Sequence, residues 1–245
     1  MKINLPKSKL VSNFLNPISY VSDKCIINIE ENNIYTLTHT DNTGDTVILY
    51  GKMTIPEKSE KLIKLNIPDV KRLKRVIECI NTDNVELEIN SNNISYTSPA
   101  LKFKYHLLED GVIQTAVMNI KKVNQLEFDT NFIIDQKSIL DLLKASSIVP
   151  DSNKVYFYTK DSKVFTELTD KTLQNIDSVT FETASSFTGT EIKSVIPISL
   201  EVIRLLVSAR FKSLTVKVNT KLKLLMFEVN DTDLTLKYIV SALVK

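Results

Sequence analysis

Four cations in one short stretch carry the most specific chemistry in this sequence. Lys71, Arg72, Lys74 and Arg75 occur within five positions, and only one acid, Glu78, follows them closely. If the stretch is helical, Lys71 and Arg75 point away from its apolar face, with Arg72 and Lys74 on either side. A cationic row of this kind suits a sequence-independent hold on a phosphate backbone, whereas the plainer interpretation is a solvated helix face. The same interpretations apply to single cations on the non-core faces of the other predicted helices: Lys9, Lys137, Lys144 and Arg204.

Other reactive residue types do not assemble into a catalytic or metal-binding motif. His39 and His106 have no metal-ligand spacing, and the four glycines are too scattered to form a phosphate-binding loop. The segment 41–45 resembles the start of a calcium loop, but Lys52 stands at the twelfth position, where a bidentate Glu is needed. Tryptophan is absent, which argues against a base-stacking surface. We therefore expect no cofactor and no metal, and an enzyme is the class that we expect least.

Composition is that of an ordinary globular protein. Hydrophobic residues make up 43%, charged residues 24%, and the formal net charge is +2. Two cysteines, Cys25 and Cys79, are too few for a disulfide framework, so we predict that both are reduced and buried, as in an intracellular protein. The N-terminus lacks the apolar stretch of a signal peptide. The most apolar window, 195–209, is interrupted by Glu201 and Arg204, so no membrane span is predicted.

Apolar periodicity predicts four helices. The first follows Pro6 and ends near Asn16-Pro17, because proline disfavours a helical residue before it. The second covers about 68–80, with Pro68 at its first position. The third covers about 135–147, and the fourth about 197–209, with Pro197 or Ser199 near its cap.

Alternating patterns between these helices predict a larger number of strands. Turn residues separate them at Glu31-Asn32-Asn33, at 42–45, at 90–93 and at Asn230-Asp231. The predicted strands cover 24–29, 34–40, 46–54, 85–89, 155–159, 178–184, 214–218 and 222–229. Each helix then has one apolar face to pack on a sheet, which predicts an α+β fold.

The helix-and-strand pattern occurs twice. Val70, Leu73 and Ile77 recur 130 positions later as Leu200, Ile203 and Val207, and the strand 85–90 recurs 129 positions later as 214–219. The strand 101–105 recurs as 234–238, at an offset of 133, so the second copy has a longer hairpin. Duplication predicts two domains, 1–110 and 125–245. Residues 111–124 lack sustained periodicity and are interpreted as a connector that leads into a strand at 125–128.

This duplicated arrangement, with cations on its helices, resembles the DNA polymerase sliding clamps, and among them the trimeric clamps of large tailed bacteriophages, including marine phages. The exit 109–111 from the first half and the matching strands Phe103-Lys104-Tyr105 and Leu236-Lys237-Tyr238 contribute to the likeness, which covers the whole chain. The resemblance implies a homotrimeric ring, with helices on the inner face and antiparallel sheets outside. It also implies that subunits join by strand pairing, which removes the liability of open sheet edges.

The resemblance further implies a role in DNA replication. The ring would encircle duplex DNA without reading its sequence, tether the replicative DNA polymerase as a processivity factor, and be opened by an ATP-driven clamp loader. Its location would be intracellular, in the host cytoplasm if the protein is phage-encoded. The cations named above would face the DNA. Partner peptides would dock at a pocket under the connector, which maps approximately onto Val112, Ile113, Val117, Leu126, Leu243 and Val244.

Two further functions remain open from the sequence. A monomeric processivity factor would use the same fold on one side of DNA, although it would need a larger basic surface than a net charge of +2 suggests. A virion or assembly protein would use the duplicated β-rich domains for packing. Salt-sensitive binding to DNA would distinguish the ring-forming clamp and the monomeric processivity factor from the virion or assembly protein, which should show none.

Overall fold

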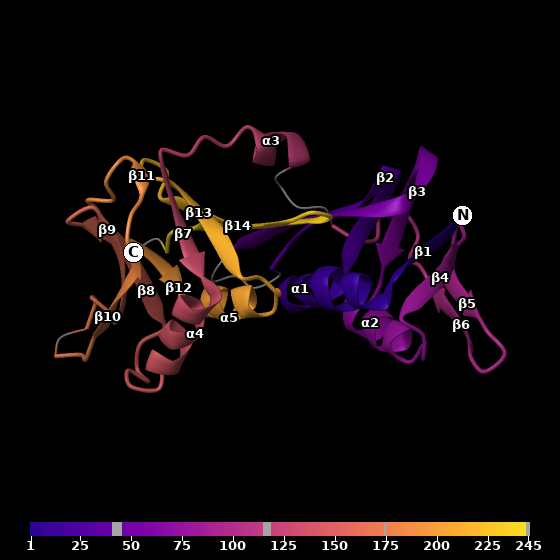
Figure 1. Cartoon of the computed structure of the whole chain (residues 1–245), viewed down its shortest axis with the longest axis horizontal. Helices are drawn as coiled ribbons and strands as arrows, with labels where there is room; N and C mark the ends of the chain where they lie inside the picture. Colours follow the sequence, from indigo (N-terminus) through magenta and orange to yellow (C-terminus); the bar gives the residue numbers. More distant parts are fainter. Residues whose placement is uncertain (41–45, 115–118, 174, 244–245) are drawn as a thin grey trace. The chain divides into compact units, whose positions relative to one another are not determined.

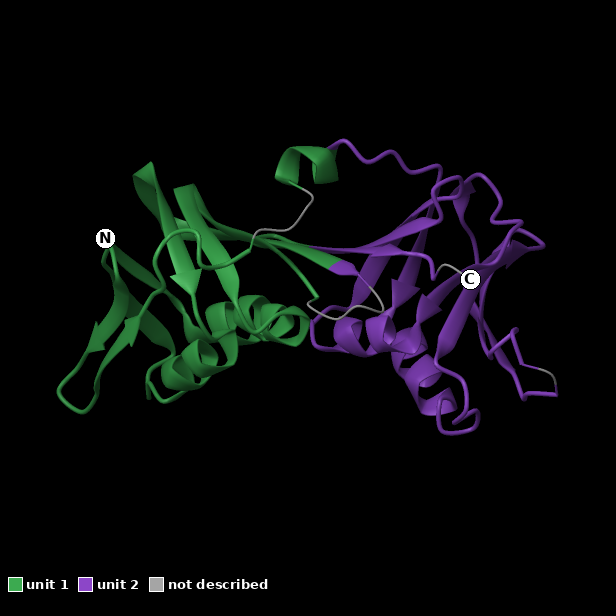
Figure 2. Cartoon of the chain, turned by 180° about the vertical axis from the view of Figure 1, so that it is seen from behind, with its two compact units in different colours: residues 1–41, 48–124, 230–236 green, residues 42–47, 125–229, 237–245 purple. Residues whose placement is uncertain are grey.

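The structure is a computed structural model that describes residues 1–40, 46–114, 119–173 and 175–243. It divides into two compact units, which Figure 2 shows in different colours. Unit 1 comprises Met1–Asp41, Ile48–Asn124 and Asn230–Leu236, and unit 2 comprises Asn42–Val47, Gln125–Val229 and Lys237–Lys245. The division is therefore not one of two unbroken halves, because a short piece near the end of the chain belongs to unit 1. We describe each unit by itself.

Unit 1 contains helices and antiparallel strands in alternating blocks (Figure 1). Two of the helical segments, η1 and α1, are continuous, and η1 has the wider π-helical winding. The elements are β1 (Lys2–Pro6), η1 (Lys9–Leu15), α1 (Asn16–Val21), β2 (Cys25–His39), β3 (Val47–Ile67), α2 (Val70–Glu78), β4 (Asn84–Ile89), β5 (Asn93–Thr97), β6 (Lys102–His106) and α3 (Ile120–Asn124).

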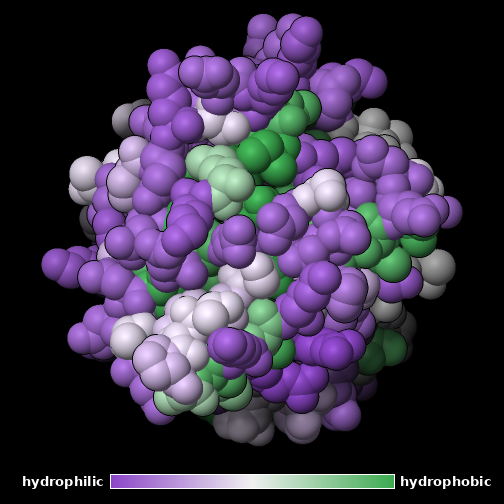
Figure 3. Space-filling model, turned by 90° about the vertical axis from the view of Figure 1, so that its right-hand side faces the viewer, coloured by the Kyte–Doolittle hydropathy of each residue, from purple (hydrophilic) through white to green (hydrophobic). Residues whose placement is uncertain are grey.

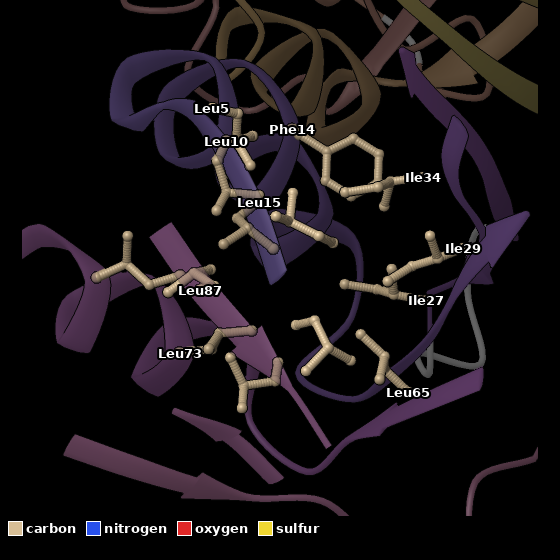
Figure 4. Close-up of a pocket in the computed structure, with 14 residues that line it drawn as sticks. Leu5, Leu10, Phe14, Leu15, Ile27, Ile29, Ile34, Leu65, Leu73 and Leu87 are labelled. Atoms are coloured by element: carbon tan, nitrogen blue, oxygen red, sulfur yellow. The ribbon is translucent and has the colours of Figure 1, made fainter. Parts of the chain in front are cut away.

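The core of unit 1 lies between its helices and its strands. One sheet has the order β1-β4-β5-β6, and β2 pairs with β3 from Cys25↔Ile67 to His39↔Ile48. Alternate residues of these strands point inward and meet the apolar faces of η1 and α2, as Figure 4 shows for Leu10, Phe14 and Leu73. The side chains leave only a small void of about 40 Å³. Because packing is this close, the helices cannot rotate, and their polar faces are fixed toward solvent.

Two sequence predictions in unit 1 are wrong. The first helix does not end at Asn16-Pro17 but continues as α1 to Val21. Pro17 stands at the junction where the π-helical winding of η1 passes into α1, and the continuous helix accommodates its ring there. The predicted turn at Glu31-Asn32-Asn33 is also wrong, because β2 runs through it. The pairing register shifts on both sides of Glu31, whose φ of 52° marks an irregularity in a continuous strand.

Unit 2 repeats the blocks of unit 1 (Figure 1). Its helices α4 and α5 begin at well-formed caps, where Asp135 accepts from the backbone N–H of Ser138 at 2.6 Å and Ser199 accepts from that of Glu201 at 3.2 Å. The elements are β7 (Thr130–Asp135), α4 (Gln136–Ala145), β8 (Lys154–Lys160), β9 (Lys163–Leu168), β10 (Val179–Ala184), β11 (Thr188–Gly189), β12 (Ile196–Ser199), α5 (Leu200–Val207), β13 (Ser213–Asn219), β14 (Leu224–Asp231) and β15 (Leu234–Ser241). The last two residues of β14, 230–231, and the first three residues of β15, 234–236, are counted with unit 1.

Antiparallel pairing also organises unit 2. One sheet has the order β10-β9-β8-β12, and in the other β11 pairs with β7, β7 with β13, and β13 with β14. Gly189 is required where β11 approaches β7. Its φ is +96°, and a Cβ there would lie 1.9 Å from the carbonyl oxygen of Asp129.

Three further predictions need correction. Pro197 does not open the fourth helix; it lies in β12 opposite Tyr156, at the edge of a sheet, where its missing N–H is tolerated. Residues 125–128 do not form a strand, and β7 begins at Thr130. Within the predicted connector, residues 120–124 form the short helix α3, whose two apolar residues, Ile120 and Val123, are too few to give a sustained period.

The register of the strands confirms the duplication. In unit 1, Ile3 pairs with Leu87, and in unit 2, Phe132 pairs with Val216. Both partners are displaced by 129 positions, so β1 and β4 are repeated by β7 and β13 in the same register. The predicted α+β class with duplicated antiparallel sheets is therefore confirmed.

Candidate nucleic-acid interface and partner pocket

The start of α2 is fixed from two directions, which sets the orientation of its cations. The carboxylate of Asp69 caps the helix by accepting from the backbone N–H of Arg72 at 2.8 Å. The Tyr105 hydroxyl donates to the Asp69 carbonyl oxygen at 2.6 Å and accepts from the Asp69 N–H at 3.0 Å. Burial raises the pKa of Tyr105 to about 12, so the hydroxyl keeps its proton for this contact. Val70, Leu73 and Ile77 form the buried face.

The four predicted cations of α2 divide into two kinds. The ammonium group of Lys71 pairs with Asp23 at 2.8 Å, and that of Lys74 donates to the side-chain oxygen of Asn16 at 2.9 Å. Arg72 and Arg75 are exposed, and neither guanidinium group has a hydrogen bond or ion pair within the part of the chain that the structure describes. They stand three positions apart and so are neighbours on one face of the helix. An incoming phosphate therefore meets two open arginine groups, which bind phosphate bidentately.

Lys9, at the start of η1, is less available than its sequence position suggests. Its ammonium group pairs with Asp233 in the turn before β15 at 2.5 Å, and both side chains are nearly half exposed. An exposed pair of this kind contributes little to stability, but it lowers the net charge that Lys9 offers to a second anion.

Unit 2 presents a weaker cationic face. Lys137 is exposed, with no ion pair among the described residues. Lys144 pairs with Asp141 at 3.0 Å one turn earlier on α4, and Arg204 pairs with Glu201 on α5. At the offset of 130, Glu201 takes the place of Lys71, and the repeat positions of Arg72 and Arg75 are held by Val202 and Leu205. Of the four cations of α2, only Lys74 has a cationic counterpart in α5, Arg204, and this difference is visible in the sequence.

A cavity of about 260 Å³ lies in unit 1 beside the start of the predicted connector. Val112 and Ile113, two of the six residues predicted for a partner pocket, line this cavity, and Val112 is 56% exposed. Its other lining residues were not predicted as site residues: Ser22, Lys24, Cys25, Ile26, Leu37, Thr38, His39 and Gln114. Alternation along 24–29 and 34–40 indicated their strands, but no local pattern in the sequence brings these segments together with residues 112–114.

The other predicted pocket residues are not among those that line this cavity in the described part of unit 1. Leu126 and Leu243 belong to unit 2, and both are partly buried. The backbone N–H of Leu243 donates to the carbonyl oxygen of Pro197 at 2.9 Å, which fixes the C-terminal segment to β12. Val117 and Val244 lie outside the residues that the structure describes.

The two histidines and two cysteines do not form a single cluster, although Cys25 and His39 both line the cavity beside Val112. Cys25 is buried, and desolvation raises the pKa of its thiol to about 12, which makes it unreactive. Cys79 is exposed at the end of α2, so the prediction of two buried cysteines is wrong for it, because it does not share the helix face of the buried Ile77. Across the described ranges, no group of three or more His, Cys, Asp or Glu residues is placed to hold a metal ion. The helices in those ranges include none that is long and apolar enough to cross a membrane.

Comparisons with known proteins agree on the fold. No protein-family model and no curated protein matches the chain. Among solved structures, PCNA from A. fulgidus bound to the C-terminal region of FEN-1 matches with a TM-score of 0.76 at 14% identity, over 100% of this chain and 98% of that one. PCNA from Entamoeba histolytica matches with a TM-score of 0.74 at 15% identity, over 98% of both chains.

A third structure, the PCNA2-PCNA3 complex from Sulfolobus tokodaii, matches with a TM-score of 0.71 at 11% identity, over 99% of both chains. Identities this low establish the fold alone. Since the likeness extends over practically the whole length of each chain, the duplicated α+β architecture of this protein is that of the PCNA-like clamps.

Proposed function

We propose that this protein is a sliding clamp that encircles duplex DNA and tethers a replicative DNA polymerase. The observation that carries the proposal is the likeness to PCNA structures over the whole chain, with a TM-score of 0.76 for the first of them. The open guanidinium groups of Arg72 and Arg75 supply the second support, because a clamp needs cations that attract phosphates without reading bases. Loose, screened attraction permits sliding, and processivity then comes from topology.

Ring closure requires two sheet edges that can pair between copies, and the two four-stranded sheets can supply them. Sheet β1-β4-β5-β6 ends at β1 and β6, and sheet β10-β9-β8-β12 ends at β10 and β12. Two of these four edges are already covered: the Glu57 carboxylate accepts from the N–H of Asn4 on β1 at 2.8 Å, and Leu243 bonds to β12. We propose that β6 of one copy pairs with β10 of the next, which joins copies head to tail.

The side chains of these two edges support the pairing. Phe103 on β6 and Phe181 on β10 point to the inner side of their sheets, yet both remain partly exposed. Pairing the edges would bury both rings. Figure 3 looks onto the end of unit 1 that carries β4–β6 and shows a mainly hydrophilic surface with separate hydrophobic areas. A closed ring of three copies follows the resemblance to the trimeric clamps of tailed phages, which is also the only basis for a phage origin.

Partner proteins would dock at the cavity lined by Val112 and Ile113. An extended peptide fits such a surface through a few main-chain hydrogen bonds and one or two apolar anchors. The FEN-1 segment bound to A. fulgidus PCNA supports this mode, because there the C-terminal region of a partner binds a protein of the same fold. The polymerase would use this cavity, and an ATP-driven clamp loader would open the ring. The clamp itself would perform no chemical step.

The mass in solution tests the assembly. Light scattering after size exclusion should give a species near three times 27.8 kDa that dissociates on dilution. Replacing Phe103 with Asp on the β6 edge should leave a folded monomer. A parent protein that is monomeric at every concentration would contradict the ring and favour a one-sided processivity factor, the alternative that needs no edge pairing.

A further inference from the structure

The entry to the connector is held down by a small polar cluster on the outer face of unit 1. The side-chain amide of Asn66 donates to the carbonyl oxygen of Leu108 at 3.2 Å and to the carboxylate of Asp110 at 2.8 Å. The Asn66 carbonyl oxygen accepts from the N–H of Leu108 at 2.9 Å. Lys64 completes the cluster, with its ammonium group 2.9 Å from the same Asp110 oxygen. We call Lys64, Asn66 and Asp110 the connector latch.

The connector latch lies on the same sheet face as the cavity beside Val112. Residues directly opposite each other in an antiparallel pair point to the same side, and Asn66 is opposite Ile26, which lines that cavity. The neighbours of Asn66 along β3, Leu65 and Ile67, are buried in the core on the other side. Asn66 is only 5% exposed because residues 108–110 cover it.

Anchoring stops where the cavity wall begins. Beyond the local turn at Asp110-Gly111, no hydrogen bond joins residues 111–114 to another residue that the structure describes. Gly111 has a φ of +84° and open space around it, so it turns the chain without being held by its neighbours. The three residues after it, Val112, Ile113 and Gln114, form one wall of the cavity. Their position therefore depends on the last fixed point before the turn, which is Asp110.

The connector latch leaves one buried polar atom unpaired, which a role in stability alone does not explain. The side-chain oxygen of Asn66, Oδ1, is buried without a hydrogen-bond partner among the described residues. A buried unpaired acceptor is unfavourable, and an apolar residue at this position would avoid it. What only an amide provides here is two donors, one for the backbone at Leu108 and one for the Asp110 carboxylate.

We propose that the connector latch is a positioning device for partner docking: it holds Val112–Gln114 against the cavity in advance, so that a peptide binds a preformed wall. The inference rests on the proposed function. Preorganisation of a binding surface raises affinity because the ordering cost is met before the partner arrives. Loss of the latch should thus weaken peptide binding while leaving the fold and the assembly unchanged, because Asp110 itself is exposed.

A tryptophan introduced as Val112→Trp tests the position of the wall directly, because the chain has no other tryptophan. In this background, Asp110→Ala should lower the fluorescence anisotropy and increase quenching by acrylamide by about twofold, as expected for a loosened segment. The matched control is Glu86→Ala, which removes another exposed ion pair of unit 1, Lys2–Glu86, far from the connector in sequence. Equal anisotropy in the Asp110→Ala variant and its parent would overturn the latch.

Docking is measured in proteins without the added tryptophan. The probe is a fluorescent peptide copying the C-terminal segment of the DNA polymerase encoded by the same genome. Asp110→Ala should raise the Kd of the peptide by about fivefold or more. Asp110→Asn keeps an acceptor for Asn66, so its Kd should lie between those of the parent protein and Asp110→Ala. An unchanged Kd would overturn the proposal. Failure of the peptide to bind the parent protein would count against the docking function instead, and the anisotropy result would still judge the latch.

Discussion

The two open arginines of α2 make the DNA interface measurable. Replacing Arg72 and Arg75 with alanine removes two guanidinium groups that have no hydrogen bond or ion pair among the described residues, and neither contributes to the buried face of the helix. Alanine is a strong helix former, so the helix should persist and the unfolding midpoint should change little. The expected loss is confined to binding of duplex DNA.

The size of the loss follows from counterion release. At about 0.9 per phosphate contact, a protomer that engages both arginines contributes about 1.8 to the slope of log K against log salt concentration. Over a fourfold rise in salt, that difference amounts to about a twelvefold change in affinity for each engaged protomer. The assay is fluorescence anisotropy of a labelled duplex, titrated with the protein at several KCl concentrations.

The matched control is on the same helix. Replacing Lys71 and Lys74 with alanine removes the same number of charges, but these groups are already engaged by Asp23 and Asn16. Their loss should change the slope by about half as much, because Asp23 already neutralises Lys71, whereas the neutral Asn16 leaves the charge of Lys74 in place. Equal slopes for the two double variants would refute the division of α2 into open and engaged cations.

Three predictions concern the stability of the fold. Leu73→Ala should cost about 2–5 kcal/mol in urea unfolding, because the side chain is 2% exposed and borders an existing void. Gly189→Ala should lower Tm, at a cost above about 1 kcal/mol, since its φ is +96° and the added Cβ meets the Asp129 carbonyl oxygen. Asp170 accepts hydrogen bonds from Thr172 at 2.6 Å and Lys154 at 2.9 Å, in that order of effect, and they lower its pKa to about 2. Because the unfolded pKa is higher, at about 3.9, this stabilisation is complete above pH 4 or so and is lost as the pH falls toward about 2. The urea midpoint should decline across that window, and less steeply in Asp170→Asn.

Local patterns in the sequence predicted those parts of the fold that local interactions determine. The helix 136–145 begins after Asp135, as its cap and apolar period indicate, and the helix 200–207 begins after Ser199. The duplication was visible because the same apolar positions recur at a nearly constant offset. Proline misled the prediction of helix boundaries twice, because the ring and the missing N–H destabilise an element only where the local geometry does not accommodate them. Pro17 stands where the π-helical η1 passes into α1, and Pro197 lies at a sheet edge, so neither proline marks the helix boundary that the sequence suggested.

The candidate sites were harder to predict, because they depend on contacts between distant segments. Nothing near Lys71 in the sequence shows that Asp23 engages it, nor that Arg72 remains open. The cavity beside Val112 joins β2 to a segment more than 70 positions away, and Asn66 holds that segment from β3. The packing of helices, loops and paired strands decides these contacts, and a single sequence does not specify it.

Retention on DNA with blocked ends tests encirclement most directly. The protein is first threaded onto linear duplex with free ends, which requires no loader, and both ends are then closed with bulky protein blocks. A shift to high salt removes electrostatic binding. A ring that encircles DNA should then be released slowly from blocked DNA and rapidly from the same DNA with free ends. Equal release rates from the two substrates would contradict a topological clamp.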